Sequence, residues 1–350
     1  MRGHDVSFRK SVAALSSCEQ AIQACARPQK RVCAPVPVPA WSLSGAAPET
    51  DAWQRGSRRP RVSCPMKAWV LLAWVAAHGA VADDREPAVL RLRPHLPPEV
   101  DASALTRFDP TEELRTGAAF IVCPGGDYVA VDPNADEGRP IAQWLARLGI
   151  TAFVLRYRTV PEGHRWPAQL EDVELALRTV RGGSAEAGLD PRRVGVMGFS
   201  AGGHLASSAA TRSDSTWRPD LQVLLYPTID TTKPDWWPWD ASAGWPAPTD
   251  STHLHVSPST PPAFVVCSTE DDISTDTDNC SPYVTRLRAA RVPVEHFVRP
   301  MGQHGFHLCG GWTDACVEWL AERQWIAPLP VGDTGGVTCD GRTVTTNLEL

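Results

Sequence analysis

The sequence predicts an α/β protein built on a mostly parallel sheet with helices on both faces. From about residue 116, short apolar runs alternate with amphipathic stretches that have helical spacing. The apolar runs are continuous rather than alternating, which is typical of strands covered on both faces. In addition, the glycine-rich turn GFSAGG at 198–203 joins one apolar run directly to a helical stretch. Alternation of strand and helix favours parallel strands joined by right-handed crossovers.

The expected elements follow one another in a regular order. The expected strands are 118–123, 151–157, 193–198, 221–226, 262–267 and 292–298. The expected helices are 138–148, 168–181, 201–212 and 278–290. In the second of these helices, Val173, Leu177 and Val180 fall on one stripe. Ligands of such sheets bind beyond the carboxyl ends of the strands, and Ser200 follows one of those ends.

The segments before and after this pattern differ from it. Residues 1–65 carry ten Lys/Arg and four Asp/Glu and show no apolar periodicity, so we expect a disordered leader or an extension of the gene model. Residues 66–82 combine one Lys, an apolar run and a small-residue end, which predicts a signal peptide and a secreted or exported protein. An organelle-targeting leader in 1–65, or a core helix in 66–82, is the alternative. The sequence then predicts one domain over 88–327 and a peripheral tail over 328–350.

Charge argues against two classes of partner. The net charge is −6, and residues 68–350 hold 36 acidic and 23 basic residues. Because an acidic body is repelled by phosphates, we expect no nucleic-acid partner and no membrane partner in the mature form.

The ten cysteines contain no C-x-x-C pair, which disfavours a zinc ribbon or a thioredoxin-type site. Cys123 and Cys267 end apolar runs, so we expect buried thiols there. The other cysteines after Met66, namely Cys280, Cys309, Cys316 and Cys339, could form disulfides in an oxidising compartment.

The turn at Ser200 predicts nucleophilic catalysis. A serine nucleophile needs a base to take its proton and an acid to orient that base. Later strands supply both in the order acid, then histidine: the tract STEDD offers Asp271 or Asp272, and RPMGQHGFH offers His304. All of these segments follow strands of one sheet and are therefore expected at one edge of it.

Backbone N–H groups near Ser200 would stabilise the negative charge of an acyl-transfer intermediate. The expected donors are Ala201, which follows the serine, and Gly125, Gly126 and Asp127 in the loop CPGGDY. Because this chemistry needs only side chains and N–H groups, no cofactor is expected.

These segments together resemble the α/β-hydrolase superfamily and, within it, the acetyl xylan esterase-like carbohydrate esterases, also labelled endo-xylanase-like or dienelactone-hydrolase-like. The resemblance covers roughly 117–325. It is carried by CPGGDY (123–128), EGRPIAQWLARLGITAFVLRYR (137–158), DPRRVGVMGFSAGGHLASSAAT (190–211), RPDLQVLLYP (218–227), PPAFVVCSTEDD (261–272) and GQHGFHL (302–308).

The resemblance implies an α/β-hydrolase fold with a short Trp-rich cap insertion. It also implies a serine esterase that removes acetyl groups from a small-molecule or carbohydrate ester. Spacing from PPAF favours Asp271 as the acid, whereas spacing back from His304, Tyr283 and Asn279 favours Asp272, which we prefer. The family commonly has P-G-G-G-Y where this chain has Asp127. A peptidase of the prolyl-oligopeptidase kind and an inactive binding protein with this fold are the alternatives.

Several other residues call for an interpretation. We expect His204 to pack or bond locally beside Ser200. His253 and His255 lie in a Ser/Pro-rich segment without a convincing carboxylate partner, so we expect no metal site. The insertion after the strand 221–226 holds aromatic residues that pack as a lid or form a wall against the substrate: Trp236, Trp237, Trp239 and Trp245.

Overall fold

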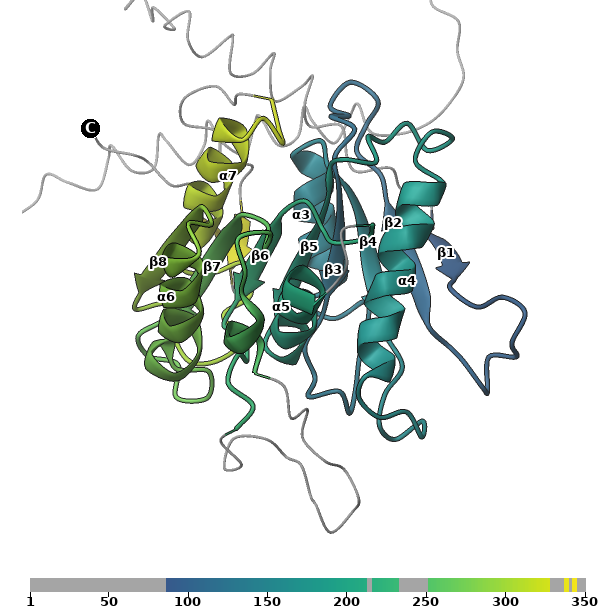
Figure 1. Ribbon diagram of the computed structural model, residues 1–350. Helices are drawn as coiled ribbons and strands as arrows, with labels where there is room; N and C mark the ends of the chain where they lie inside the picture. The colour runs from purple at the N-terminus through teal and green to yellow at the C-terminus, as the bar shows by residue number, and fades with distance from the viewer. Residues whose placement is uncertain (1–85, 213–215, 233–250, 328–336, 340–341, 345–350) are drawn as a thin grey trace, which may run out of the picture. The chain divides into compact units, whose positions relative to one another are not determined.

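The computed structural model describes residues 86–212, 216–232, 251–327, 337–339 and 342–344 (Figure 1). The expected leader, the signal-peptide-like segment and the four tryptophans of the insertion lie outside the described residues. In the expected tail, β9 (Val337–Cys339) and β10 (Arg342–Val344) form an antiparallel pair.

The main sheet has eight strands in the order β1-β2-β4-β3-β5-β6-β7-β8. Their bounds are β1 Ala88–Arg91, β2 Ala104–Phe108, β3 Ala119–Cys123, β4 Thr151–Arg156, β5 Val194–Phe199, β6 Gln222–Leu225, β7 Ala263–Ser268 and β8 Val294–Arg299. The six strands from β3 onward are parallel to one another, as the continuous apolar runs predict.

The first two strands were not expected from the sequence. β1 pairs antiparallel with β2, and β2 pairs antiparallel with β4. The edge strand β1 is only four residues long, and its apolar residues Ala88, Val89 and Leu90 are exposed, so the strand is not marked by a long buried apolar run.

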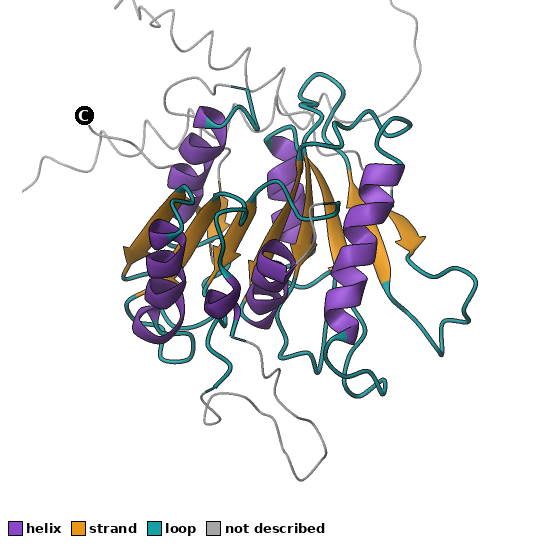
Figure 2. Ribbon diagram, in the orientation of Figure 1, coloured by secondary structure: helices purple, strands orange, loops and turns teal. Residues whose placement is uncertain are grey.

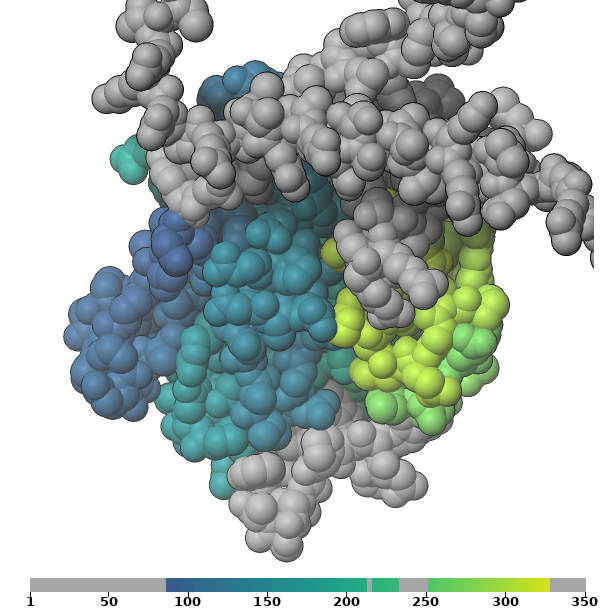
Figure 3. Space-filling view, turned by 180° about the vertical axis from the view of Figure 1, so that it is seen from behind, coloured from purple at the N-terminus to yellow at the C-terminus, as the bar shows by residue number. Residues whose placement is uncertain are grey.

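Helices cover both faces of the sheet, as predicted (Figure 2). One face packs against α4 (Ala168–Gly182), α5 (Ala201–Arg212) and α6 (Ser281–Ala289). The other face packs against α3 (Arg139–Arg147) and α7 (Trp312–Glu322) and is turned toward the viewer in Figure 3. The helix α7 was not expected from the sequence. The helix expected over 278–290 is preceded by a π turn, η4 (Asp276–Cys280), so α6 itself begins at Ser281.

The central strands contribute to two hydrophobic cores at once. In β3, Ile121 and Cys123 belong to the core under α4 and α5, whereas Phe120 and Val122 belong to the core under α3 and α7. Because successive side chains of a strand point to opposite faces, every residue of such a strand has to be apolar.

The carboxyl ends of β3, β5, β7 and β8 lie along one edge of the sheet, toward the bottom of Figure 1. The loops that follow these four strands carry the expected site residues. Within the described residues, no helix is both long and apolar enough to span a membrane.

Candidate active site

Ser200 lies in a tight turn between β5 and α5. Its φ is +51°, in the left-handed region that a serine adopts only when its surroundings impose it. Glycines on both sides make room for the turn: a Cβ on Gly198 would lie 2.2 Å from the Gly202 carbonyl oxygen, and one on Gly202 would lie 2.0 Å from the Cys123 carbonyl oxygen. The turn therefore presents the serine hydroxyl at the carboxyl edge of the sheet, at the start of a helix.

His304 follows β8 and contacts Ser200. Its Nε2 lies 2.8 Å from the Ser200 Oγ, and its Nδ1 lies 2.8 Å from Oδ2 of Asp271. A carboxylate at Nδ1 only accepts hydrogen bonds, so it fixes the proton on Nδ1 and leaves Nε2 as an acceptor for the serine hydroxyl. These contacts join residues that lie 104 and 33 positions apart in the sequence.

The acid that contacts His304 is Asp271, which corrects our preference for Asp272. The Asp271 side chain is fully buried, whereas Asp272 is exposed. The turn after β7 decides between them, because Oδ1 of Asp271 accepts the backbone N–H groups of Ile273 and Ser274 at 2.8 and 2.9 Å. Burial alone would raise the pKa of Asp271, but the bond from His304 and these two N–H groups outweigh it and lower that pKa.

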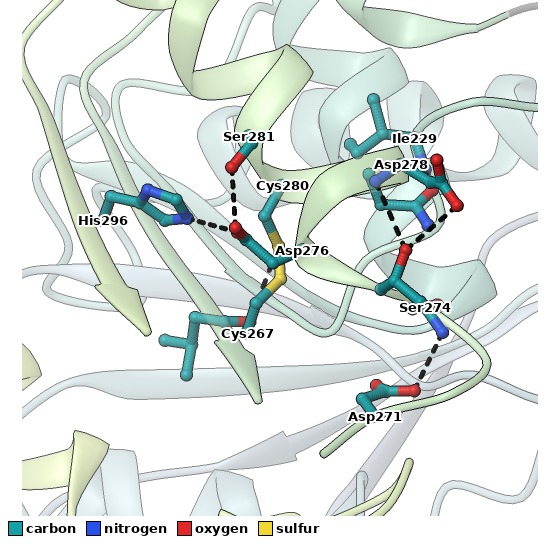
Figure 4. Close-up of a disulfide and its surroundings, with 12 residues drawn as sticks. Ile229, Cys267, Asp271, Ser274, Asp276, Asp278, Cys280, Ser281 and His296 are labelled. Carbon is teal, nitrogen blue, oxygen red and sulfur yellow. Dashed lines mark hydrogen bonds and ion pairs between the residues drawn. A yellow bond between two sulfur atoms is a disulfide. The ribbon is translucent and has the colours of Figure 1, made fainter. Parts of the chain in front are cut away.

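A disulfide brackets the segment that carries Asp271 (Figure 4). Cys267 in β7 is bonded to Cys280, 13 residues further along the chain. This corrects the expectation of a buried thiol at Cys267, whereas Cys123 is a buried free thiol as predicted. Beside the disulfide, Asp276 accepts hydrogen bonds from His296 and Ser281 at 2.8 and 2.7 Å (Figure 4). The acid therefore lies in a closed and internally bonded loop.

The loop after β3 lies against the serine. A Cβ on Gly125 would approach the Ser200 Cβ to 3.1 Å. The Tyr157 hydroxyl lies 2.9 and 2.8 Å from the carbonyl oxygens of Pro124 and Gly125, so this hydroxyl fixes the carbonyl side of the loop.

Three of the four expected N–H donors have no acceptor among the described residues: Gly126, Asp127 and Ala201. The fourth, Gly125, donates its N–H to Oε2 of Glu137 at 2.6 Å. This corrects the expectation for Gly125, because an N–H engaged by a carboxylate does not point at a substrate oxygen as well.

Residues 120–308 match the α/β hydrolase fold family. The chain belongs to the α/β-hydrolase family. This confirms the family and the fold that the sequence blocks indicated.

The relatives of this hydrolase include named ester hydrolases. It is 33% identical over 254 residues to the acetylxylan esterase of Xylanibacter ruminicola, covering 68% of this chain and 52% of that protein. It is 31% identical over 221 residues to endo-1,4-beta-xylanase B of Butyrivibrio fibrisolvens, covering 55% of this chain and 34% of that protein. The hydrolase thus spans about half, or less, of the length of these relatives.

Among solved structures, the hydrolase resembles the acetyl ester-xyloside bifunctional hydrolase from Caldicellulosiruptor lactoaceticus. The TM-score is 0.59 at 30% identity, and the match covers 71% of this chain and all of that one.

The side chain of Asp127 lies half-buried near His304 in this hydrolase. Burial raises the pKa of the Asp127 carboxyl, and attraction to His304 acts in the opposite direction. Asp127 and the following Tyr128 both have φ near +60°, so the loop is tightly turned at this point.

His204 is fully buried beside the nucleophile turn of the hydrolase. Its Nδ1 lies 2.8 Å from the Tyr128 hydroxyl, and the Trp166 ring lies 4.9 Å from the His204 ring between centroids. Burial lowers the pKa of His204 to about 3, so the imidazole is neutral at physiological pH. The structure therefore places His204 in local packing and bonding, as expected.

His253 and His255 lie in a short 3₁₀ helix, η3 (Thr252–His255). Burial lowers the pKa of both imidazoles. Among the described residues, one group of possible metal-ligating side chains lies close together, formed by Cys267, Asp276 and Cys280. Two of those three are the disulfide cysteines, and neither histidine belongs to the group.

Glu137 and Tyr226 lie at this site although the sequence alone did not indicate them. Oε1 of Glu137 accepts the Tyr226 hydroxyl at 2.8 Å, and the Tyr226 ring packs edge-on against His304 with centroids 4.9 Å apart. Both residues fall inside the sequence blocks quoted for the family resemblance, but their partners lie too far away in sequence for spacing to reveal them.

Proposed function

We propose that this hydrolase is a serine esterase that removes short acyl groups, chiefly acetyl, from a carbohydrate. The observation that carries the proposal is the pair of 2.8 Å contacts that join Ser200 to His304 and His304 to Asp271. This arrangement activates a hydroxyl for attack on an acyl carbon.

Acylation would begin when Ser200 Oγ attacks the ester carbonyl and its proton passes to Nε2 of His304. Asp271 stabilises the imidazolium that results and keeps its ring in place. The N–H groups of Gly126, Asp127 and Ala201 are available to bind the tetrahedral oxyanion. Losing one such donor typically costs about 3–4 kcal/mol of transition-state stabilisation. The imidazolium then protonates the leaving alcohol.

Deacylation repeats these steps with water as the nucleophile. His304 takes a proton from water, the hydroxide attacks the acyl-serine, and Ser200 recovers its proton as the acid leaves. Every proton is carried by His304, so this route needs no further titratable group.

The acyl and alcohol parts of the proposed substrate rest on similarity. The relatives include an acetylxylan esterase, and the solved structure at 30% identity is named an acetyl ester-xyloside bifunctional hydrolase. The relative named as a xylanase shares only 34% of its length with this chain. We therefore propose ester cleavage without cleavage of the xylan backbone.

The test has two arms. In the first, kcat/KM is measured on p-nitrophenyl acetate, butyrate and octanoate; we expect it to fall with chain length, since each methylene without a pocket forgoes about 0.8 kcal/mol of burial. In the second, acetylated xylan is assayed for acetate and for reducing sugar, and we expect acetate alone. A maximum at octanoate, or acetylated xylan left intact, would overturn the proposed substrate class.

A further inference from the structure

We propose that Glu137 is a positioning residue. It fixes the loop 125–127, called the oxyanion loop below, and the ring of Tyr226, which packs against His304. The proposal deepens the esterase function proposed above and rests on it. Among the described residues, the Glu137 carboxylate hydrogen-bonds to Gly125 and Tyr226 and not to Ser200, His304 or Asp271, and the catalytic steps do not use it.

Each oxygen of the Glu137 carboxylate accepts one hydrogen bond. Oε2 accepts the N–H of Gly125 at 2.6 Å, and Oε1 accepts the hydroxyl of Tyr226 at 2.8 Å. Both partners are buried, and one lies 12 and the other 89 residues from Glu137 in the sequence. Hydrogen bonds to a carboxylate are shorter and stronger than those between neutral groups, so this link is well suited to fix two loops.

The first partner controls the oxyanion loop. Gly125 lies directly before Gly126 and Asp127, whose N–H groups are proposed to bind the oxyanion. With the Gly125 N–H turned to Glu137 and its carbonyl bonded to Tyr157, the peptide planes on both sides of Gly125 are held. The direction of the following N–H groups depends on these planes.

The second partner of Glu137 is Tyr226, whose ring packs against His304. Tyr226 follows β6, and its ring packs edge-on against His304 and Phe306 with centroid separations of 4.9 and 4.7 Å. Its φ of +36° is in the left-handed region, so its backbone is fixed by its surroundings. The bond to Glu137 fixes the distal end of the same ring.

Glu137 itself is on a rigid support. The next two residues, Gly138 and Arg139, donate their N–H groups to Ala135 and Pro133, both at 2.8 Å. The helix α3 then begins at Arg139. Because the backbone around Glu137 is fixed by these hydrogen bonds, we infer that Glu137 positions the oxyanion loop rather than the reverse.

The experiment compares Glu137→Ala, Glu137→Gln and Tyr226→Phe on p-nitrophenyl acetate, with kcat and KM measured separately. A misplaced oxyanion loop affects the transition state more than substrate binding. We therefore expect Glu137→Ala to lower kcat by about 10- to 100-fold with KM changed less than about threefold. Glu112→Ala is the control, because the Glu112 side chain is 82% exposed and makes a single ion pair with Arg115.

The Glu137→Gln variant distinguishes the loss of the two hydrogen bonds from a general loss of protein stability. The amide oxygen of Gln can accept the Gly125 N–H, and its NH₂ can donate to the Tyr226 hydroxyl. Glu137→Gln should therefore recover most of the kcat lost in Glu137→Ala. Tyr226→Phe should lower kcat in the native background but not in the Glu137→Ala background, because the bond is already absent there. If Glu137→Ala fails to fold, Glu137→Met replaces it in both comparisons, because the methionine side chain has a similar length and its thioether is only a weak acceptor.

The outcomes are distinct. A kcat for Glu137→Ala within twofold of the wild type, a Gln variant no better than Ala, or additive losses in the double variant would each overturn the role of Glu137. Labelling of Ser200 by a fluorophosphonate tests the proposed function separately. If the wild type is labelled and the Glu137 variants keep the wild-type kcat, only the positioning role of Glu137 is overturned. If the wild type neither reacts with the fluorophosphonate nor hydrolyses esters, the proposed esterase function and the role of Glu137 are both overturned.

Discussion

Nδ1 of His304 lies 2.8 Å from Oδ2 of Asp271, while the neighbouring Asp272 is exposed. The two aspartates are adjacent in the sequence and identical in chemistry. The turn after β7 distinguishes them, because it directs two backbone N–H groups onto Asp271. The two N–H groups therefore orient Asp271 in addition to its contact with His304.

Asp271→Asn should lower kcat by about 10⁴-fold if the residue acts as the orienting acid does in the best-studied triad, because the amide favours the wrong histidine tautomer. Asp272→Asn is the matched control and should change kcat less than twofold. Steady-state rates on p-nitrophenyl acetate measure both. Similar losses in the two variants would contradict the assignment of Asp271.

Gly202→Ala should damage both stability and activity. The new Cβ would lie 2.0 Å from the Cys123 carbonyl oxygen and 2.4 Å from that of Pro124, and both are backbone atoms. Relief of this clash requires α5 to move away from the oxyanion loop, at a cost of about 1–3 kcal/mol.

Gly182→Ala, in the last turn of α4, is the control for Gly202→Ala. A Cβ there meets nothing within 4 Å, so this change should be neutral or should stabilise by up to about 1 kcal/mol. Chemical denaturation and ester hydrolysis of the two variants give the comparison. Equal stabilities would refute the packing argument.

His204 should make the protein less stable in mild acid. Burial lowers its pKa in the folded state to about 3, below the value near 6.5 of an unfolded chain. The unfolded chain therefore binds the proton first, and this contribution to stability is complete above about pH 6.5 and is lost as the pH falls toward 3.

His204→Asn removes that titration, while its amide can still meet the Tyr128 hydroxyl. We expect its free energy of unfolding to depend less steeply on pH over this window, by up to about 1.4 kcal/mol per pH unit. Urea denaturation at a series of pH values measures the slopes. Parallel curves for the two proteins would show that His204 does not titrate in this way.

The parallel part of the sheet could be predicted from the sequence because most of its strands are buried and mainly apolar. The edge strand β8 is the exception, since only Phe297 in it is buried. The strand β1 could not be predicted, since it is short and its side chains are mostly exposed, and β2 could not because Thr106 and Arg107 interrupt its apolar residues.

Within the site, Ser200 and His304 could be predicted because a turn motif and the order of strands locate them. The choice between Asp271 and Asp272 depends on which carboxylate the turn directs inward, and spacing does not report that. Glu137 escaped prediction for a related reason: its partners are a backbone N–H and a tyrosine 89 residues away.

Hydrolysis of p-nitrophenyl acetate by Ser200→Ala tests the central claim most directly. Ser208→Ala is the matched control, because Ser208 lies buried on α5 and its hydroxyl has no hydrogen-bond partner in the described structure. Ser200→Ala should give a folded protein whose turnover falls by several orders of magnitude, whereas Ser208→Ala should keep wild-type activity. Turnover by Ser200→Ala close to the wild-type rate would rule out Ser200 as the nucleophile.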